Sequence, residues 1–212
     1  LLHKALKIIP ENKGLLANLG RCCAVQAEQA ISAGTDPTRN LQAGEAALAR
    51  AQALDAHYWG PLQYLGELRS AAATWRALHH HADRKDFDLA TEAFQRALDV
   101  TPDSQEALLA LARLCRARAA WERTVGGDPG RSLAEGRTAL ERVLKARPQW
   151  GEALALRGGL LLEEAEGLPP SGRGPKVREA LKDLGEAFAL NRNLARAWKP
   201  WVERAQRLRS AS

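Results

Sequence analysis

Two groups of residues in this 212-residue chain have side chains that could bind a metal ion or attack a substrate. His79, His80 and His81 are consecutive, so they would point in different directions on a helix, and no cysteine accompanies them at a ligand spacing. Cys23 and Cys115 would each need a histidine base to act as nucleophiles, and the sequence indicates none. We therefore expect an exposed histidine turn, and cysteines that pack as small apolar side chains.

Other enzyme signatures are missing from the sequence. The chain has no Gly-x4-Gly-Lys-Ser/Thr, Gly-x-Ser-x-Gly or His-Glu-x2-His motif, and residues 86–88, Asp-Phe-Asp, only superficially resemble a kinase motif. The turn at residues 126–130 could hold an anion at a helix start, but its glycines and proline are also typical of a turn between helices. We expect no catalytic residue, metal or cofactor.

The composition predicts an all-α fold. The sequence contains 40 Ala and 33 Leu but only 9 Val and Ile together, and this composition favours helices over sheets. No stretch approaches the roughly 20 apolar residues of a membrane span, and no secretory signal opens the chain. Three cysteines are too few for a disulfide framework, which suits a reducing compartment. We predict a cytoplasmic protein that does not act at a membrane.

A pattern of small and large residues recurs along the chain with a period near 46 residues. In the second half of each repeat, a small residue is followed four positions later by a large one and three positions after that by a small or branched one, so all three share one helix face. The four copies begin at Gly44, Ala90, Gly136 and Ala180. A large-x2-Leu-Gly pattern precedes these copies, as at residues 16–20 and 62–66.

These motifs resemble those of tetratricopeptide repeats, which pair two antiparallel helices and stack the pairs into a solenoid. The resemblance covers nearly the whole chain and predicts an α-solenoid that forms a single array. We expect the end of a truncated repeat at 1–9, repeats at 10–55, 56–101, 102–147 and 148–191, and a C-terminal capping helix at 192–212. Because the chain opens inside a predicted helix, we expect it to be a piece of a longer protein.

The period exceeds the usual tetratricopeptide length of about 34 residues, so we expect both helices of each pair to be lengthened. Asp36-Pro37 and Asp128-Pro129 place an N-cap acceptor directly before a proline at the first helical position and predict starts of second helices, with Gly174-Pro175 as a weaker start. Residues 168–174 before it are expected to be irregular and mobile.

Long-period arrays with such Asp-Pro turns resemble the C-terminal regions of large bacterial serine/threonine protein kinases. This resemblance implies a role in signalling and an attached kinase domain outside the chain.

Without catalytic motifs, we expect function to lie in the concave groove that stacked first helices form in a solenoid. The groove residues predicted by register are Asn18, Arg21, Gln63, Glu67, Leu109, Arg113 and Arg116. Tetratricopeptide domains that hold chaperone carboxylates carry Lys, Asn and Arg at positions where this chain has Ala17, Arg21, Tyr64, Glu106 and Ala110. A protein or peptide of mixed charge is therefore the expected ligand.

Charge of one sign gathers only near the C-terminus. Most of the formal net charge of +6 lies there, and the predicted basic helix carries Arg192, Arg196, Lys199, Arg204 and Arg207. We expect these residues to give the capping helix a polar outer face, or else to meet an acidic partner, with nucleic acid as the less favoured candidate. An acidic cluster, Glu163, Glu164 and Glu166, is expected to be a solvated face.

Three functional hypotheses follow from the sequence. The first is a non-catalytic scaffold that binds proteins through its groove. The second is a regulatory segment that controls an attached serine/threonine kinase in cis without an external ligand. The third is nucleic-acid binding through the basic helix, which predicts an affinity that falls steeply with salt.

Overall fold

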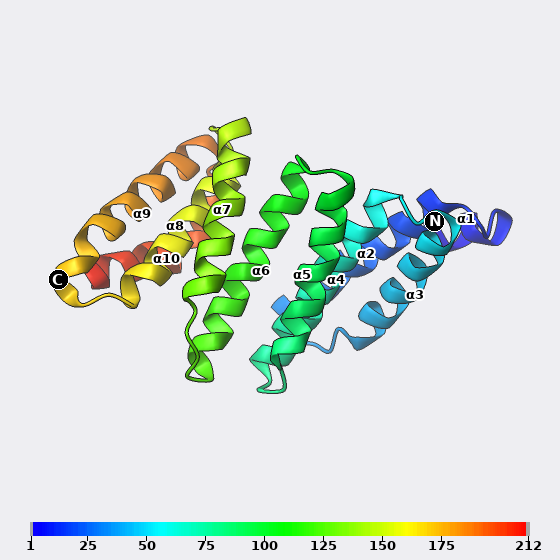
Figure 1. Ribbon diagram of the computed structural model, residues 1–212, viewed down its shortest axis with the longest axis horizontal. Coiled ribbons are helices and arrows are strands. Elements are labelled where there is room, and N and C mark those ends of the chain that lie inside the picture. Colours follow the sequence, from blue (N-terminus) through cyan, green and yellow to red (C-terminus); the bar gives the residue numbers. More distant parts are fainter. Residues whose placement is uncertain (1, 211–212) are drawn as a thin grey trace. The chain divides into compact units, whose positions relative to one another are not determined.

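The computed structural model describes residues 2–210 and contains, in that range, ten α-helices and no β-strand (Figure 1). The helices are α1 (Leu2–Ile8), α2 (Lys13–Ser32), α3 (Thr38–Leu54), α4 (Trp59–Leu78), α5 (Arg84–Val100), α6 (Gln105–Thr124), α7 (Gly130–Ala146), α8 (Gly151–Glu166), α9 (Pro170–Leu190) and α10 (Asn193–Ser210). Successive helices pack as neighbouring pairs, which confirms the predicted all-α solenoid of stacked helix pairs.

The helix starts confirm the 46-residue period. The first helices α2, α4, α6 and α8 begin at residues 13, 59, 105 and 151, and the second helices α3, α5 and α7 begin at 38, 84 and 130. The lengthening is also confirmed, because α2, α4 and α6 each have 20 residues and α3, α5 and α7 each have 17.

Two of the three predicted starts of second helices are confirmed to within one residue, because α3 and α7 begin directly after Pro37 and Pro129, which are the N-cap residues and not the first helical residues. The Asp36 carboxylate accepts hydrogen bonds from the backbone N–H and the hydroxyl of Thr38, and these bonds lower the pKa of Asp36. Asp128 accepts one from the N–H of Gly130 in the same way. The bonds from the N–H groups of Thr38 and Gly130 satisfy backbone donors that the first turn of a helix cannot pair internally.

The third predicted start, Gly174-Pro175, was wrong. Helix α9 begins earlier, at Pro170, and Pro175 lies inside it. Pro170 at the first helical position has its φ already set for a helix and lacks an N–H that would go unpaired there. The segment expected to be irregular and mobile, residues 168–174, is therefore helical from Pro170 onward.

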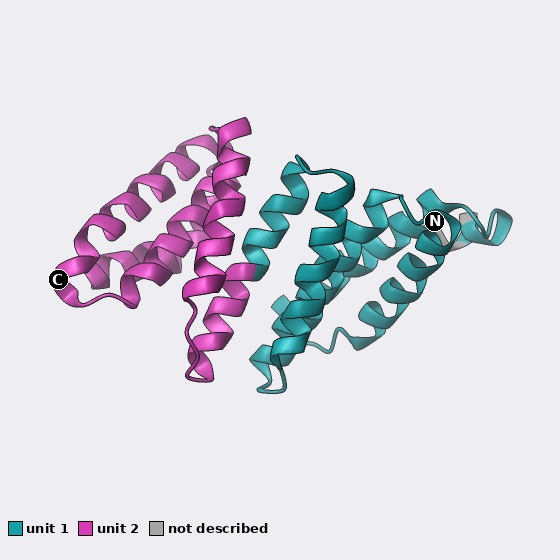
Figure 2. Ribbon diagram, in the orientation of Figure 1, with its two compact units in different colours: residues 1–114 teal, residues 115–212 magenta. Residues whose placement is uncertain are grey.

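The chain divides into two compact units, residues 1–114 and residues 115–212 (Figure 2). The boundary falls within α6, so its first half belongs to unit 1 and its second half to unit 2. In unit 1, α2 packs against α3 and α4, and α4 packs against α3 and α5. In unit 2, α8 packs against α7, α9 and α10, and α10 also contacts α9.

The two helices of a pair approach closely where a glycine faces a large side chain. A β-carbon on Gly66 of α4 would lie 2.6 Å from the Phe94 ring of α5, and one on Gly20 would overlap Leu48 of α3. In unit 2, a β-carbon on Gly158 would lie 3.1 Å from Leu184 of α9. The recurring small and large positions of the sequence therefore meet across each of these helix pairs.

None of the helices described combines the length and the apolarity needed to cross a bilayer.

Candidate binding face

The predicted groove residues of unit 1 lie on three first helices. Asn18 and Arg21 are on α2, Gln63 and Glu67 are on α4, and Leu109 and Arg113 are on the first half of α6. Asn18, Arg21 and Arg113 are exposed, Glu67 is half-buried, and Gln63 and Leu109 are buried. The set therefore combines a charged surface with an amide and a leucine beneath it.

Glu67 lies at the centre of these residues. Burial raises its pKa, a hydrogen bond from the Gln63 amide at 2.9 Å lowers it, and repulsion from Glu28 raises it again. Attraction by Arg113 and Arg21 lowers the pKa, but the balance stays on the raised side. These four interactions show that the structure brings residues of α2, α4 and α6 close together around one carboxylate.

Sequence reasoning missed Glu28 as a member of this face. Glu28 lies seven residues after Arg21 on α2, which is two helical turns, and this spacing places both on one side of the helix. Its side chain reaches solvent, yet partial burial raises its pKa, and Arg113 offsets only part of that rise. The seven-residue spacing was the available signal, because it continues the line from Asn18 through Arg21. We call Arg21, Glu28, Gln63, Glu67 and Arg113 the unit 1 face.

Arg116, the last predicted groove residue, lies in unit 2, on the second half of α6. Its guanidinium lies 5.0 Å from the centroid of the Trp201 ring of α10. The Arg204 guanidinium lies 4.8 Å from the same centroid, and the ring centroids of Trp201 and Trp198 are 5.5 Å apart. Trp198 in turn lies over Gly159 of α8, where a β-carbon would come within 3.0 Å of its ring. Helix α10 therefore covers this part of α8.

The predicted basic helix is confirmed as a helix, but its cations differ in their surroundings. Arg204 is half-buried and forms ion pairs with Glu163, at 3.1 Å, and with Glu166. Arg196, Lys199 and Arg207 of α10 are exposed, and Arg192, which was expected on this helix, is exposed and lies one residue before α10 begins. One cation of the helix thus stabilises its packing and the rest remain at the surface.

The expectation that the acidic cluster is a solvated face was wrong. Glu163 is only 3% exposed and pairs with Arg123 of α6 as well as with Arg204. Glu164 pairs with Arg137 of α7 at 3.3 Å and with Lys176 of α9. The cluster forms ion pairs with several helices because α7, α9 and α10 all pack against α8. The local sequence does not reveal these neighbours.

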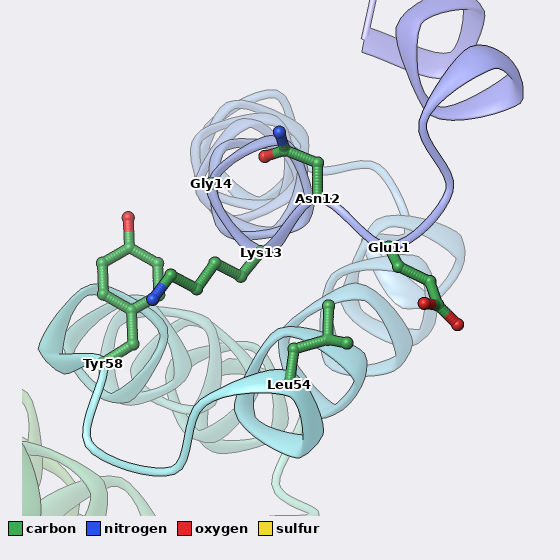
Figure 3. A pocket seen from close by; sticks show the side chains of 6 residues that line it. All are labelled: Glu11, Asn12, Lys13, Gly14, Leu54 and Tyr58. Atoms are coloured by element: carbon green, nitrogen blue, oxygen red, sulfur yellow. The ribbon is translucent and has the colours of Figure 1, made fainter.

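An open hollow of about 640 Å³ lies where α2 begins and α3 ends, and its lining includes Glu11, Leu54 and Tyr58 (Figure 3). The Lys13 side chain runs toward the Tyr58 ring, with its ammonium 5.4 Å from the ring centroid, and pairs with Asp55 at 2.5 Å. The only cation of the lining already has a carboxylate partner, so among the residues described the hollow offers an anionic ligand no unpaired positive charge.

The candidate chemical groups occupy the surroundings expected for them. Residues 79–81 form an exposed turn, and Cys23 and Cys115 are buried at 5% and 2% exposure. Burial raises the pKa of both thiols, which favours the unreactive protonated form. In the described part of the chain, no three His, Cys, Asp or Glu side chains come together in a way that could hold a metal ion.

A scan against protein-family models finds no match to the chain, and a search of curated proteins finds no relative.

Proposed function

We propose that the chain is a non-catalytic scaffold of the long-period tetratricopeptide type that binds a protein or peptide through the unit 1 face. The observation that carries this proposal is that Arg21, Glu28 and Arg113, from α2 and α6, act on the half-buried carboxylate of Glu67 on α4. Charges of both signs on a helical surface suit a polypeptide partner, whose side chains and backbone offer donors and acceptors together.

A wider role for the parent protein is part of the proposal. The Asp-Pro turns and the repeat period support membership in the C-terminal region of a bacterial serine/threonine kinase or a similar cytoplasmic signalling protein. The alternative is regulation of such a kinase in cis, in which the unit 1 face would contact the attached domain. The two differ in whether the isolated chain retains a partner from solution.

Nucleic-acid binding has less support. Arg204 is engaged with two carboxylates, and Trp201 lies between two arginines, so neither is available for phosphates or base stacking. The remaining exposed cations suit the capping role. Absence of oligonucleotide binding at low salt would remove this candidate.

The test is an affinity capture from cytosolic extract with the immobilised chain and a charge-reversed variant, Arg21→Glu, Glu67→Arg and Arg113→Glu. The matched control reverses three exposed charges on the second helices of unit 1, Arg39→Glu, Glu45→Arg and Arg96→Glu, and so has the same net charge. A partner held by the wild type and the control but lost from the face variant supports a scaffold. Equal capture by all three proteins contradicts the assigned face, and capture by none favours regulation in cis.

A further inference from the structure

The helix pair α8–α9 contains an ion pair between its two helices. The Nε and Nη2 atoms of Arg157 on α8 donate to the two carboxylate oxygens of Asp183 on α9, at 2.6 and 2.7 Å. Asp183 is only 1% exposed, whereas Arg157 is half-buried. The hydrogen bonds to Asp183 raise the pKa of Arg157, so the guanidinium stays charged. A contact through two parallel bonds holds the two side chains in one fixed orientation.

The other repeats have apolar side chains at these two positions. Arg157 lies two 46-residue periods after Leu65 of α4. Asp183 and Ala93 of α5 each precede the large residue that meets the glycine of the first helix. Leu65 and Ala93 belong to one buried apolar cluster of unit 1. The corresponding residues are Leu19 and Ala47 in the first repeat, and Leu111 and Ala139 in the third.

The small and large residues of the repeat do not by themselves determine which helices pair. Gly158 of α8 meets Leu184 of α9 just as Gly20 of α2 meets Leu48 of α3. A second helix from another repeat would therefore offer α8 the same close contact. Misassembly of similar units is a characteristic failure of repeat proteins during folding, so a further feature is needed to distinguish the correct partner.

We propose that the ion pair between Arg157 and Asp183 selects α9 as the partner of α8 during folding. If α8 paired with α3 or α5, the Arg157 guanidinium would face an alanine and would lose its carboxylate. If α9 paired with α2 or α4, the Asp183 carboxylate would be buried against a leucine without a cation, which is strongly unfavourable. Only the correct pairing compensates both charges. This device acts on the assembly of the fold and does not depend on the proposed binding role.

The test replaces the ion pair with the residues of the other repeats, in the double variant Arg157→Leu and Asp183→Ala. Exchange of a buried ion pair for apolar side chains is often neutral or stabilising, so the urea midpoint should equal or exceed that of the wild type. Both proteins are then refolded from urea at about 10 μM, and size-exclusion chromatography with light scattering measures the fraction that regains the mass of the untreated protein. We expect this fraction to be at least about twofold lower for the double variant.

The matched control is Lys182→Gln with Glu186→Gln, which removes an exposed ion pair of α9 with 3.9 Å between its charged atoms. Like the double variant, it leaves the net charge unchanged, and it should refold like the wild type. The single variant Arg157→Leu leaves the buried Asp183 carboxylate without its cation, so its urea midpoint should fall below that of the double variant.

Three results overturn the inference. The first is a double variant that refolds as completely as the wild type. The second is a double variant with a lower urea midpoint than the wild type, because a weaker fold then accounts for any misassembly. The third is a single variant Arg157→Leu that is as stable as the double variant, because Asp183 then does not depend on Arg157.

Discussion

Carboxylates on the first helices of the two units differ in their burial and in whether a cation compensates their charge. In unit 2, Glu163 is almost fully buried and is compensated by Arg123 and Arg204. In unit 1, Glu67 is half-buried and has an amide as its hydrogen-bond donor, with its pKa raised. A carboxylate on a first helix can therefore form ion pairs inside the protein, as in unit 2, or remain partly exposed to solvent, as in unit 1. The difference predicts opposite effects of the same substitution in the two units.

The largest effect is expected for Glu163→Gln. The substitution leaves Arg123 and Arg204 without their shared carboxylate, and breaking a buried ion pair costs about 3–5 kcal/mol, which we reduce to about 2–3 because both arginines reach solvent. Urea unfolding should show this loss. The control Glu141→Gln removes an exposed carboxylate 3.7 Å from Arg137 and should change stability by less than about 0.5 kcal/mol. Equal effects of the two substitutions would mean that Glu163 is not a compensated internal charge.

A smaller effect is expected for Trp201→Ala. The indole contacts two arginines and Trp198, so its loss should cost about 2 kcal/mol and should loosen α10 from α8. Hydrogen exchange should accelerate in α10 and remain unchanged in α2. Trp59→Ala is the comparison in unit 1, because Trp59 is 42% exposed and should cost less than about 1 kcal/mol. Unchanged exchange in α10 would show that Trp201 does not hold this helix.

A higher salt concentration should change amide exchange in unit 2 more than in unit 1, but by less than the Trp201 substitution does. Raising the NaCl concentration from about 0.05 M to 0.5 M shortens the Debye length severalfold and screens the half-exposed pairs of Arg204. We expect amide exchange in α10 to become about threefold faster relative to α2. A shift of α2 by the same factor would mean that both units depend equally on ion pairs.

The smallest effect, and the one with opposite sign, is expected for Glu67→Gln. A carboxyl whose folded pKa lies above its ordinary value of 4.5 makes the fold less stable as pH rises through the interval between the two values. The substitution removes this cost, so the melting temperature should rise by about 1–2 °C at pH 7 and by nothing measurable near pH 4. A melting temperature lowered at pH 7 would show that the ionised carboxylate is compensated after all.

The helices and their period could be predicted because they depend on local sequence. The spacing of small and large residues indicated the pairs, and the contacts of Gly20 and Gly66 confirm that these positions meet their neighbours closely. Arg21, Glu67 and Arg113 were predicted to share one face for the same reason, because register in a repeat fixes which side of a helix a residue occupies, and their role in binding stays a prediction.

Ion pairs between helices could not be predicted in this way. Glu163 and Arg204 are 41 residues apart, and their contact depends on how α10 packs against α8. The helical spacing from Arg21 indicated the side of α2 on which Glu28 lies, but its electrostatic effect on Glu67 of another helix depends on how α2 packs against α4. The start of α9 was misplaced because Pro170 also suits the first helical position and lies earlier in the chain than Pro175.

The glycine contacts have a consequence for how such a sequence can change over evolutionary time. Gly20 meets Leu48, Gly66 meets Phe94 and Gly158 meets Leu184, so each tight contact is closed within one helix pair. A larger residue at one of these glycines needs a compensating change only in the partner helix of the same pair. Gly44 of α3 in turn meets Leu68 of α4, so a tight contact also joins successive pairs, and a change there needs compensation in the next pair. A duplicated pair carries its own complementary contact with it.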